Sequence, residues 1–149
     1  MSVDFYLLPK IPVNHDPVIA RDWLERETGR FGEIPSALDP AVESRKRKLA
    51  DLIVKLKPQF SEFNIRYEEI AQLEKISVEG ARRKYRYIEI NGPGIQITVY
   101  DHHIAVGVYS KVDANELDAL FAALSAYGVF VLFDSQSDRV IDLGEESFA

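Results

Sequence analysis

The sequence predicts a single α+β domain in which the helices pack on one face of a largely antiparallel sheet. Three observations lead to this class. Apolar residues recur at helical spacing in separate segments before residue 85, and from there they alternate. Short turns separate the alternating segments, as in antiparallel hairpins. A length of 149 residues suits one domain and not two. We therefore expect residues 1–149 to form one unit, with a frayed tail at 144–149.

The first two elements are delimited by proline and by a capping aspartate. Residues 3–8 alternate in polarity and predict a strand that ends at Pro9. Asp16 can accept hydrogen bonds from free backbone N–H groups, and Pro17 suits the first position of a helix. We expect this helix to end near Gly29.

The same Asp-Pro device occurs a second time. Residues 30–38 have no steady period and predict a loop, after which Asp39 and Pro40 start a helix that ends at Pro58. The remaining elements expected before residue 85 are a short extended piece at 60–66, a helix at 68–76 and a helical turn capped by Ser77.

A three-stranded meander follows. Its predicted strands are 85–90, 95–100 and 104–108, each with alternating apolar residues. Residues 91–94, Asn-Gly-Pro-Gly, form a turn between the first two strands, and a tight bend at 101–103 joins the second to the third.

A capping box marks the last predicted helix. Asp113 and Glu116 flank its first turn, and Gly128 closes it. Strands at 129–133 and 139–143 complete the chain, which gives the order strand, three helices, three strands, helix, two strands. The residues of the last helix expected to face the core are Leu117, Leu120, Phe121 and Leu124.

Composition excludes several classes of protein. The chain has no cysteine, which excludes disulfides, thiolate metal sites and a cysteine nucleophile and suits a reducing compartment. Its first residues lack the positive charge of a signal peptide, and their apolar run stops at Pro9, too short to span a membrane. We therefore expect a cytoplasmic protein without a membrane partner.

Segments scattered along the chain resemble a set of small bacterial proteins for which no activity is established. They are residues 1–6, 67–85 and the final hairpin at 130–142. In that set the final turn resembles Asp-Pro-Gln-Thr-Gly, whereas this chain has Ser135 and Asp138 in the proline and glycine places. The resemblance implies a fold and a bacterial source, and it implies no activity.

Asp101, His102 and His103 form the sharpest local cluster of reactive side chains. They superficially resemble the Asp-His-His motif of a phosphoesterase superfamily that binds manganese, and such side chains suit a divalent transition metal. Adjacent residues at a strand end tend to point to opposite faces, however, and a hairpin turn is the simpler explanation. A metal-dependent hydrolase centred on these residues is one hypothesis.

Two basic segments, 45–48 and 82–84, suggest a phosphate-binding face with aromatic neighbours. The net charge of −6 and the pI of about 5.1 argue against a nucleic-acid partner. Solvated faces of amphipathic helices are the favoured explanation for the two segments. No cofactor motif and no catalytic residue is predicted, because no nucleophile elbow, phosphate loop or paired carboxylate in a suitable context occurs.

Tyrosines of the meander are the candidate binding residues, and they are Tyr85, Tyr87, Tyr100 and Tyr109. Cross-strand packing under a helix is the alternative role for them. The leading hypothesis is a non-enzymatic protein-binding module, in particular an immunity- or antitoxin-like protein whose acidic face binds a basic toxin. A structural or regulatory homodimer, formed through the edge of the meander, is the second hypothesis.

Overall fold

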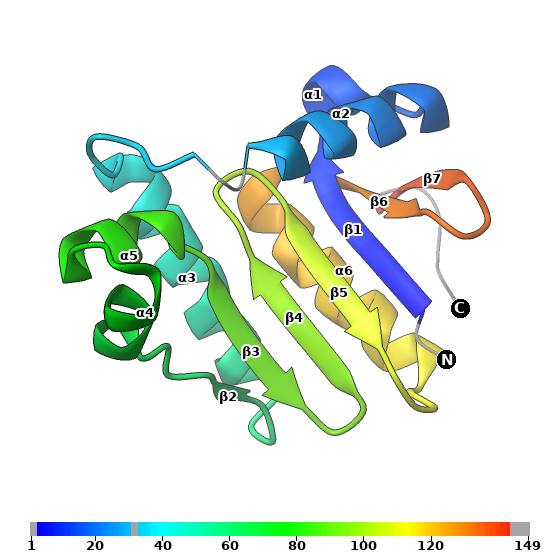
Figure 1. Cartoon of the computed structure of the whole chain (residues 1–149). Coiled ribbons are helices and arrows are strands. Elements are labelled where there is room, and N and C mark those ends of the chain that lie inside the picture. Colours follow the sequence, from blue (N-terminus) through cyan, green and yellow to red (C-terminus); the bar gives the residue numbers. More distant parts are fainter. Residues whose placement is uncertain (1–2, 31–32, 144–149) are drawn as a thin grey trace.

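The computed structural model describes residues 3–30 and 33–143, which form one sheet with helices around it (Figure 1). This confirms the α+β class. The predicted frayed tail at 144–149 and part of the predicted loop at 30–38 lie outside the described residues. The strands are β1 (Val3–Pro9), β2 (Ser61–Glu62), β3 (Ile88–Gly92), β4 (Ile95–Val99), β5 (Ile104–Val108), β6 (Phe130–Asp134) and β7 (Arg139–Asp142). The helices are α1 (Lys10–Val13), α2 (Pro17–Gly29), α3 (Pro40–Leu56), α4 (Tyr67–Glu74), α5 (Val78–Lys84) and α6 (Ala114–Gly128).

The first strand lies in the middle of the sheet. The strand order is β2-β3-β4-β5-β1-β6-β7, and every neighbouring pair is antiparallel. In β1, Leu7 pairs with Ile104 of β5 on one side and with Leu132 of β6 on the other. The predicted meander β3–β4–β5 is therefore one part of a larger sheet.

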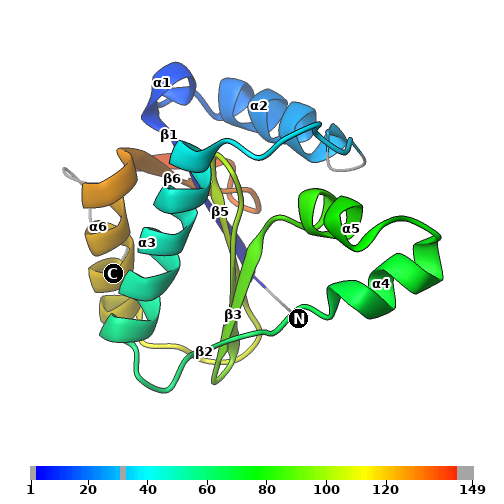
Figure 2. The same ribbon diagram turned by 90° about the vertical axis from the view of Figure 1, so that its left-hand side faces the viewer.

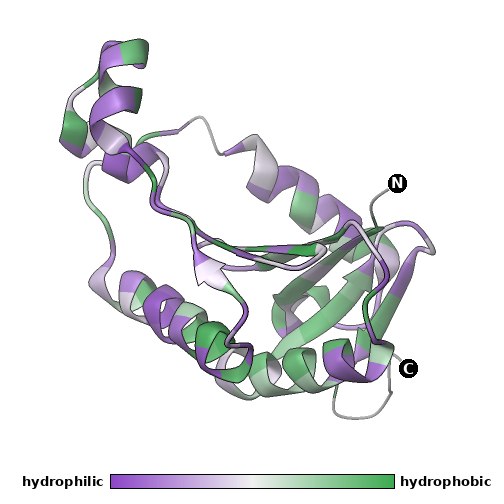
Figure 3. Ribbon diagram, turned by 90° about the horizontal axis from the view of Figure 1, so that it is seen from below, coloured by the Kyte–Doolittle hydropathy of each residue, from purple (hydrophilic) through white to green (hydrophobic). Residues whose placement is uncertain are grey.

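The larger core lies between one face of the sheet and helices α3 and α6 (Figure 2). The stripe predicted for α6 is confirmed, because Leu117, Leu120, Phe121 and Leu124 are all buried. On α3 the buried apolar residues are Leu49, Ala50 and Ile53. Figure 3 shows that the strands are mostly hydrophobic, whereas the helices beside them carry hydrophilic stretches.

A second, smaller core lies on the opposite face and corrects one part of the prediction. Leu8 of β1 and Phe133 of β6 point to this face, and Val13 and Ala20 of the α1–α2 segment cover them. Successive residues of a strand point to opposite faces, so β1 and β6 contribute to both cores. The helices are thus not confined to one face of the sheet, as Figure 2 shows for α1 and α2.

The capping residues at the predicted helix starts are confirmed. Asp16, Asp39, Ser77 and Asp113 each accept a hydrogen bond from a backbone N–H two or three residues further on. These signals are local, since a capping side chain contacts the first turn of its own helix. The proline-rich connection, predicted as irregular, contains the short helix α1.

The predicted strand at 85–90 begins three residues too early. Helix α5 continues to Lys84, and the backbone N–H of Tyr85 closes it by donating to the carbonyl oxygen of Ala81. The strand β3 starts only at Ile88. Tyr85 and Tyr87 therefore lie in the connection from helix to strand and not on the sheet.

Candidate functional site

Three of the four predicted binding tyrosines lie together. The ring of Tyr87 is 6.4 Å from that of Tyr85 and 5.7 Å from that of Tyr100, measured between centroids. The row continues from Tyr100 to His103, stacked at 4.6 Å, and from His103 to Trp23 of α2 at 5.5 Å. We call these five rings the aromatic row. It joins α2, the β4–β5 loop and the connection from α5 to β3.

The fourth tyrosine lies elsewhere. Tyr109 follows β5, is 56% exposed and donates a hydrogen bond to the side-chain oxygen of Gln96 at 2.9 Å. Gln96 in turn donates to Glu89 at 2.9 Å, so these residues form a polar network on the sheet. A single tyrosine-bearing face with all four residues is therefore not present in the structure.

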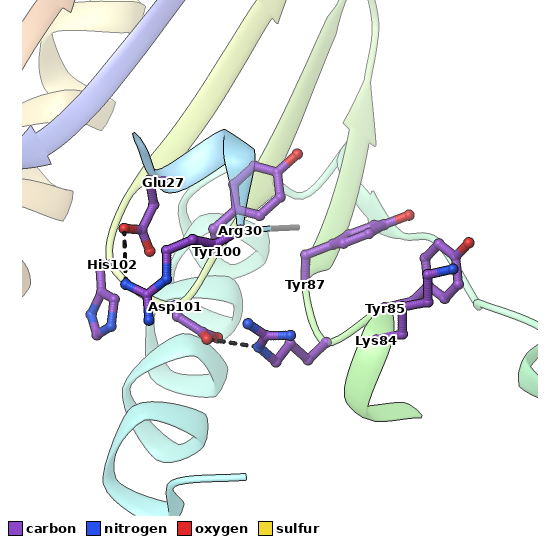
Figure 4. A pocket seen from close by; sticks show the side chains of 9 residues that line it. Glu27, Arg30, Lys84, Tyr85, Tyr87, Tyr100, Asp101 and His102 are labelled. Carbon is purple, nitrogen blue, oxygen red and sulfur yellow. Dashed lines mark hydrogen bonds and ion pairs between the residues drawn. The ribbon is translucent and has the colours of Figure 1, made fainter. Parts of the chain in front are cut away.

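A cavity of about 220 Å³ opens beside the aromatic row (Figure 4). Residues of α2, of the end of α5 and of the β4–β5 loop surround it, so it forms only when these three parts are in place. The residues that line it are Glu27, Arg30, Lys84, Tyr85, Arg86, Tyr87, Tyr100, Asp101 and His102. We call this cavity the tyrosine pocket.

Asp101 at the edge of the pocket is held by two cations. Its Oδ1 accepts from the Nζ of Lys46 at 2.6 Å, and its Oδ2 accepts from the Nε of Arg86 at 2.8 Å. Burial raises the pKa of Asp101, but the hydrogen bonds from Lys46 and Arg86 outweigh burial and hold this pKa below its usual value. Asp101 is therefore an ionised carboxylate that fixes the β4–β5 loop, and each of its two oxygens accepts a hydrogen bond from a cation.

Lys46 is the buried centre of this arrangement. It is 1% exposed, although lysine is rarely buried unless it is paired. Besides Asp101, its Nζ contacts Glu43 at 2.5 Å and donates to the carbonyl oxygen of Arg86 at 2.6 Å. One side chain thus ties α3 to the β4–β5 loop and to the connection that carries Tyr85 and Tyr87.

The three residues of the predicted metal site point to different places. Asp101 points to Lys46 and Arg86, His103 is 2% exposed within the aromatic row, and His102 lies on the surface with its Nδ1 3.4 Å from Arg45. Burial lowers the pKa of His103 to about 4, and the neighbouring His102 adds to this effect. In the described part of the chain, no three His, Asp or Glu side chains are grouped to hold a metal ion. The geometry favours an ion-paired loop.

The tyrosines of the pocket are neutral phenols near pH 7. Burial raises the pKa of Tyr87 and of Tyr100, and the hydrogen bond to Glu74 raises the pKa of Tyr85. A neutral phenol donates and accepts hydrogen bonds and offers an apolar ring, but it is a poor nucleophile at this pH. These side chains are suited to binding.

The two basic segments lie at this site in part. Arg45 donates to the backbone oxygen of Asp101, and Lys46 binds its carboxylate. Lys84, from the second segment, lines the pocket and pairs with Glu74. Lys46 and Lys84 are therefore engaged in ion pairs, and Arg45 in a hydrogen bond to the backbone, instead of being simply solvated.

Several residues of the site carry no signal in the sequence. Trp23, Glu27 and Arg30 come from α2, more than fifty residues before the tyrosines. The only signal for them is the helical spacing of Trp23 and Glu27 with Ala20, which places these two on one face of the helix. For Lys46, helical spacing alone could have indicated burial, because this residue falls on the same face of α3 as Leu49, Ala50 and Ile53.

Comparison with family models, with curated proteins and with solved structures gave no match for this chain. The resemblance to small bacterial proteins therefore stays a prediction. Among the described helices, none combines the length and the apolar character needed to cross a membrane.

Proposed function

We propose that this chain is a protein-binding module and that the tyrosine pocket is its recognition site. The observation that carries the proposal is the gathering of Tyr85, Tyr87 and Tyr100 around one cavity. Tyrosines bring large contact area and a hydrogen-bonding group at a low cost in conformational entropy, and they are enriched among residues that dominate binding energies.

The size of the cavity supports a side chain as its occupant. Sites for drug-sized molecules measure about 300–1,000 Å³, whereas this cavity measures about 220 Å³. It has room for one anchoring side chain or one single ring. Such an anchor in a pocket surrounded by weaker contacts is the usual anatomy of a protein interface.

The charge of the chain supports a partner that is basic over the rest of its surface. A net charge of −6 attracts a positively charged protein and speeds its association. An immunity-like role, in which the chain binds and neutralises a basic toxin, fits this charge and the pocket. This finer proposal rests on composition and on the pocket alone.

Dimerisation through the edge of the meander receives less support. The outer side of β5 pairs with β1, and the outer side of β3 pairs with β2. The backbone N–H of Phe63 extends the second contact by donating to the oxygen of Glu89. A second copy would therefore have to pair with β2 or β7 and not with the meander.

Co-expression with the product of the adjacent gene tests the proposal. We expect that product to inhibit growth alone and this chain to restore growth. In the purified pair, Tyr87→Ala should weaken binding at least tenfold by calorimetry, because it removes the central ring of the pocket, a loss of about 1.4 kcal/mol.

Tyr109→Ala is the matched control, because Tyr109 is an exposed tyrosine outside the pocket. Its affinity should stay close to that of the unchanged chain. An adjacent gene whose product neither inhibits growth nor binds the chain would remove the immunity role. Equal losses in both tyrosine variants would show that binding does not depend on the pocket.

A further inference from the structure

We infer that the tyrosine pocket recognises a carboxylate joined to a single ring. The inference deepens the proposed function, on which it rests, by naming the chemistry of the anchor. Two sources carry this chemistry: the free carboxyl end of a partner chain that finishes in an aromatic residue, and a small aromatic acid. Both present a flat apolar body and one negative charge within a few bonds.

The charges around the pocket favour an anion. Three cationic side chains, Arg30, Lys84 and Arg86, and two carboxylates, Glu27 and Asp101, line it. Glu74, outside the lining, pairs with Lys84, so the cations that remain for a ligand are Arg30 and Arg86. Lys46, behind Asp101, already neutralises that carboxylate together with Arg86.

Arg86 is the residue best placed to bind the anion. Its Nε donates to Asp101 and its Nη1 donates to the carbonyl oxygen of Arg83, which fixes the plane of the guanidinium. Among the described residues its Nη2 donates no hydrogen bond. A guanidinium held in this way is preorganised for the planar geometry of a carboxylate.

Arg30 supplies a second, more mobile cation. Its nearest carboxylate oxygens, on Glu27 and Glu33, lie 3.9 Å and 3.8 Å away, so neither contact is a hydrogen bond. The side chain is 65% exposed and extends beside Tyr100 in Figure 4. It has the freedom to turn toward a ligand without breaking a close ion pair.

A phosphate suits the pocket less well than a carboxylate. Phosphate groups bind where helices begin, because free N–H groups and the positive end of the helix dipole point outward there. Here α2 and α5 both end at the pocket, with Glu27 and Arg30 on one side and Lys84 on the other.

The apolar part of the ligand has a matching surface in Tyr87 and Tyr100. The two rings contact each other, with centroids 5.7 Å apart and planes inclined by 55°, so a ligand ring would pack beside this pair, in the offset or edge-to-face arrangement that aromatic rings prefer. An apolar cavity of about 150 Å³ accommodates benzene. The cavity of about 220 Å³ therefore has room for one ring and its carboxylate.

Titration of the full chain with phenylacetate and with its neutral analogue phenylacetamide tests the inference. Calorimetry measures the binding, because Trp23, the single tryptophan, does not line the pocket. We expect phenylacetate to bind at least tenfold more tightly than phenylacetamide, and more tightly than benzylphosphonate. Equal binding of acid and amide, tighter binding of the phosphonate, or no binding of any probe would overturn the inference.

Two variants connect this preference to the proposed cations. Arg86→Lys keeps the charge beside Asp101 but removes the planar fork, and Arg30→Met removes an exposed cation without disturbing a close pair. Each should reduce the acid-over-amide preference at least threefold. Arg139→Met, at an exposed position of β7, is the control and should leave this preference unchanged. A preference that survives in both pocket variants would contradict the assignment.

A short peptide that ends in phenylalanine, with a free or an amidated carboxyl end, separates the two sources. Tighter binding of the free-acid peptide than of phenylacetate identifies a chain end, and the reverse order identifies a small acid; both support the inference. Loss of partner binding in Tyr87→Ala, together with equal binding of acid and amide, would leave the proposed function standing and remove this inference alone.

Discussion

The ammonium group of Lys46 lies where three parts of the chain meet: α3, the β4–β5 loop and the connection to β3. Lys46→Met leaves Asp101 with one cation and leaves the oxygen of Arg86 without its donor. Breaking a buried ion pair by removing one partner costs about 3–5 kcal/mol. We expect urea unfolding of this variant to show a loss of that size.

Lys48→Met is the matched control, since Lys48 is exposed on the same helix. Its stability should change by no more than about 0.5 kcal/mol. Similar losses in the two variants would contradict a special role for Lys46.

His103 gives the stability of the fold a dependence on pH. Its pKa is about 4 in the folded chain and about 6.5 when unfolded, so the unfolded state binds a proton more readily. Stability is therefore full above pH 6.5 and falls as the pH drops toward 4. The difference in pKa corresponds to about 3 kcal/mol.

Urea midpoints measured between pH 7 and pH 4 check this expectation. The fall should be much smaller in His103→Phe, which keeps a ring in the aromatic row and cannot titrate. His15→Gln, at an exposed position, should follow the unchanged chain. A slope that His103→Phe does not alter would assign the effect to other groups.

Individual residues of the site were predictable where the chemistry is local. Tyr85 and Tyr87 are two residues apart just before β3, Tyr100 directly follows the neighbouring strand β4, and the three rings do meet. Tyr109 is also a tyrosine of the meander, but it lies away from the other three. The sequence does not show at which end of the sheet each strand terminus lies, so this separation could not be predicted. Trp23 joins the same row through the packing of α2, which no spacing along the chain reveals.

The end of α6 offers a prediction at the scale of the element. Gly128 ends the helix, but the left-handed residue is Val129, with φ of 51° and a side chain that is 63% exposed. A branched residue is strained in this conformation. Val129→Gly should raise the free energy of unfolding by about 0.5–1 kcal/mol.

Gly128→Ala should have the opposite effect. A Cβ at Gly128 would lie 2.1 Å from the ring of Phe130, which is buried in the larger core. Thermal melts of the two variants check both directions. A stabilised Gly128→Ala, or a destabilised Val129→Gly, would contradict the assignment of the strained residue.

Helices whose ends depend on capping were predictable, and those that depend on packing were less so. The stripe of α6 was correct at all four positions. Leu73 of α4, spaced as in an amphipathic helix, is 82% exposed, and Ala71 is the buried residue. Leu56 of α3 is also exposed, while Lys46 takes a place on the buried face. Spacing identifies a helix, but the neighbouring elements decide which face is covered.

At the scale of the whole molecule, the antiparallel class was predictable and the order of strands was not. Hairpin turns reveal that β3, β4 and β5 are neighbours, as are β6 and β7. No local signal indicates that β1 separates these two groups. The alternating polarity of β1 suggests one covered face, whereas helices cover both faces of this strand.

The central position of β1 predicts its resistance to hydrogen exchange. Its backbone pairs with β5 and with β6, and Leu7 and Leu8 are fully buried. Amides of β1 should exchange at rates close to those set by global unfolding. The amides of β2 and of β7, which have one neighbour each, should exchange faster. Mass spectrometry of exchanged peptides checks this order, and β7 exchanging as slowly as β1 would contradict it.

The place of β1 also has a consequence for the making of the protein. On the ribosome, the segment Val3–Pro9 is synthesised before either of its partners. It gains its first neighbour only when β5 has emerged and its second when β6 has, about 125 residues later along the chain. Until β5 emerges, the apolar side chains of β1, Leu7 and Leu8 among them, have no strand to pair beside, so the nascent chain exposes an unpaired apolar segment for most of its translation.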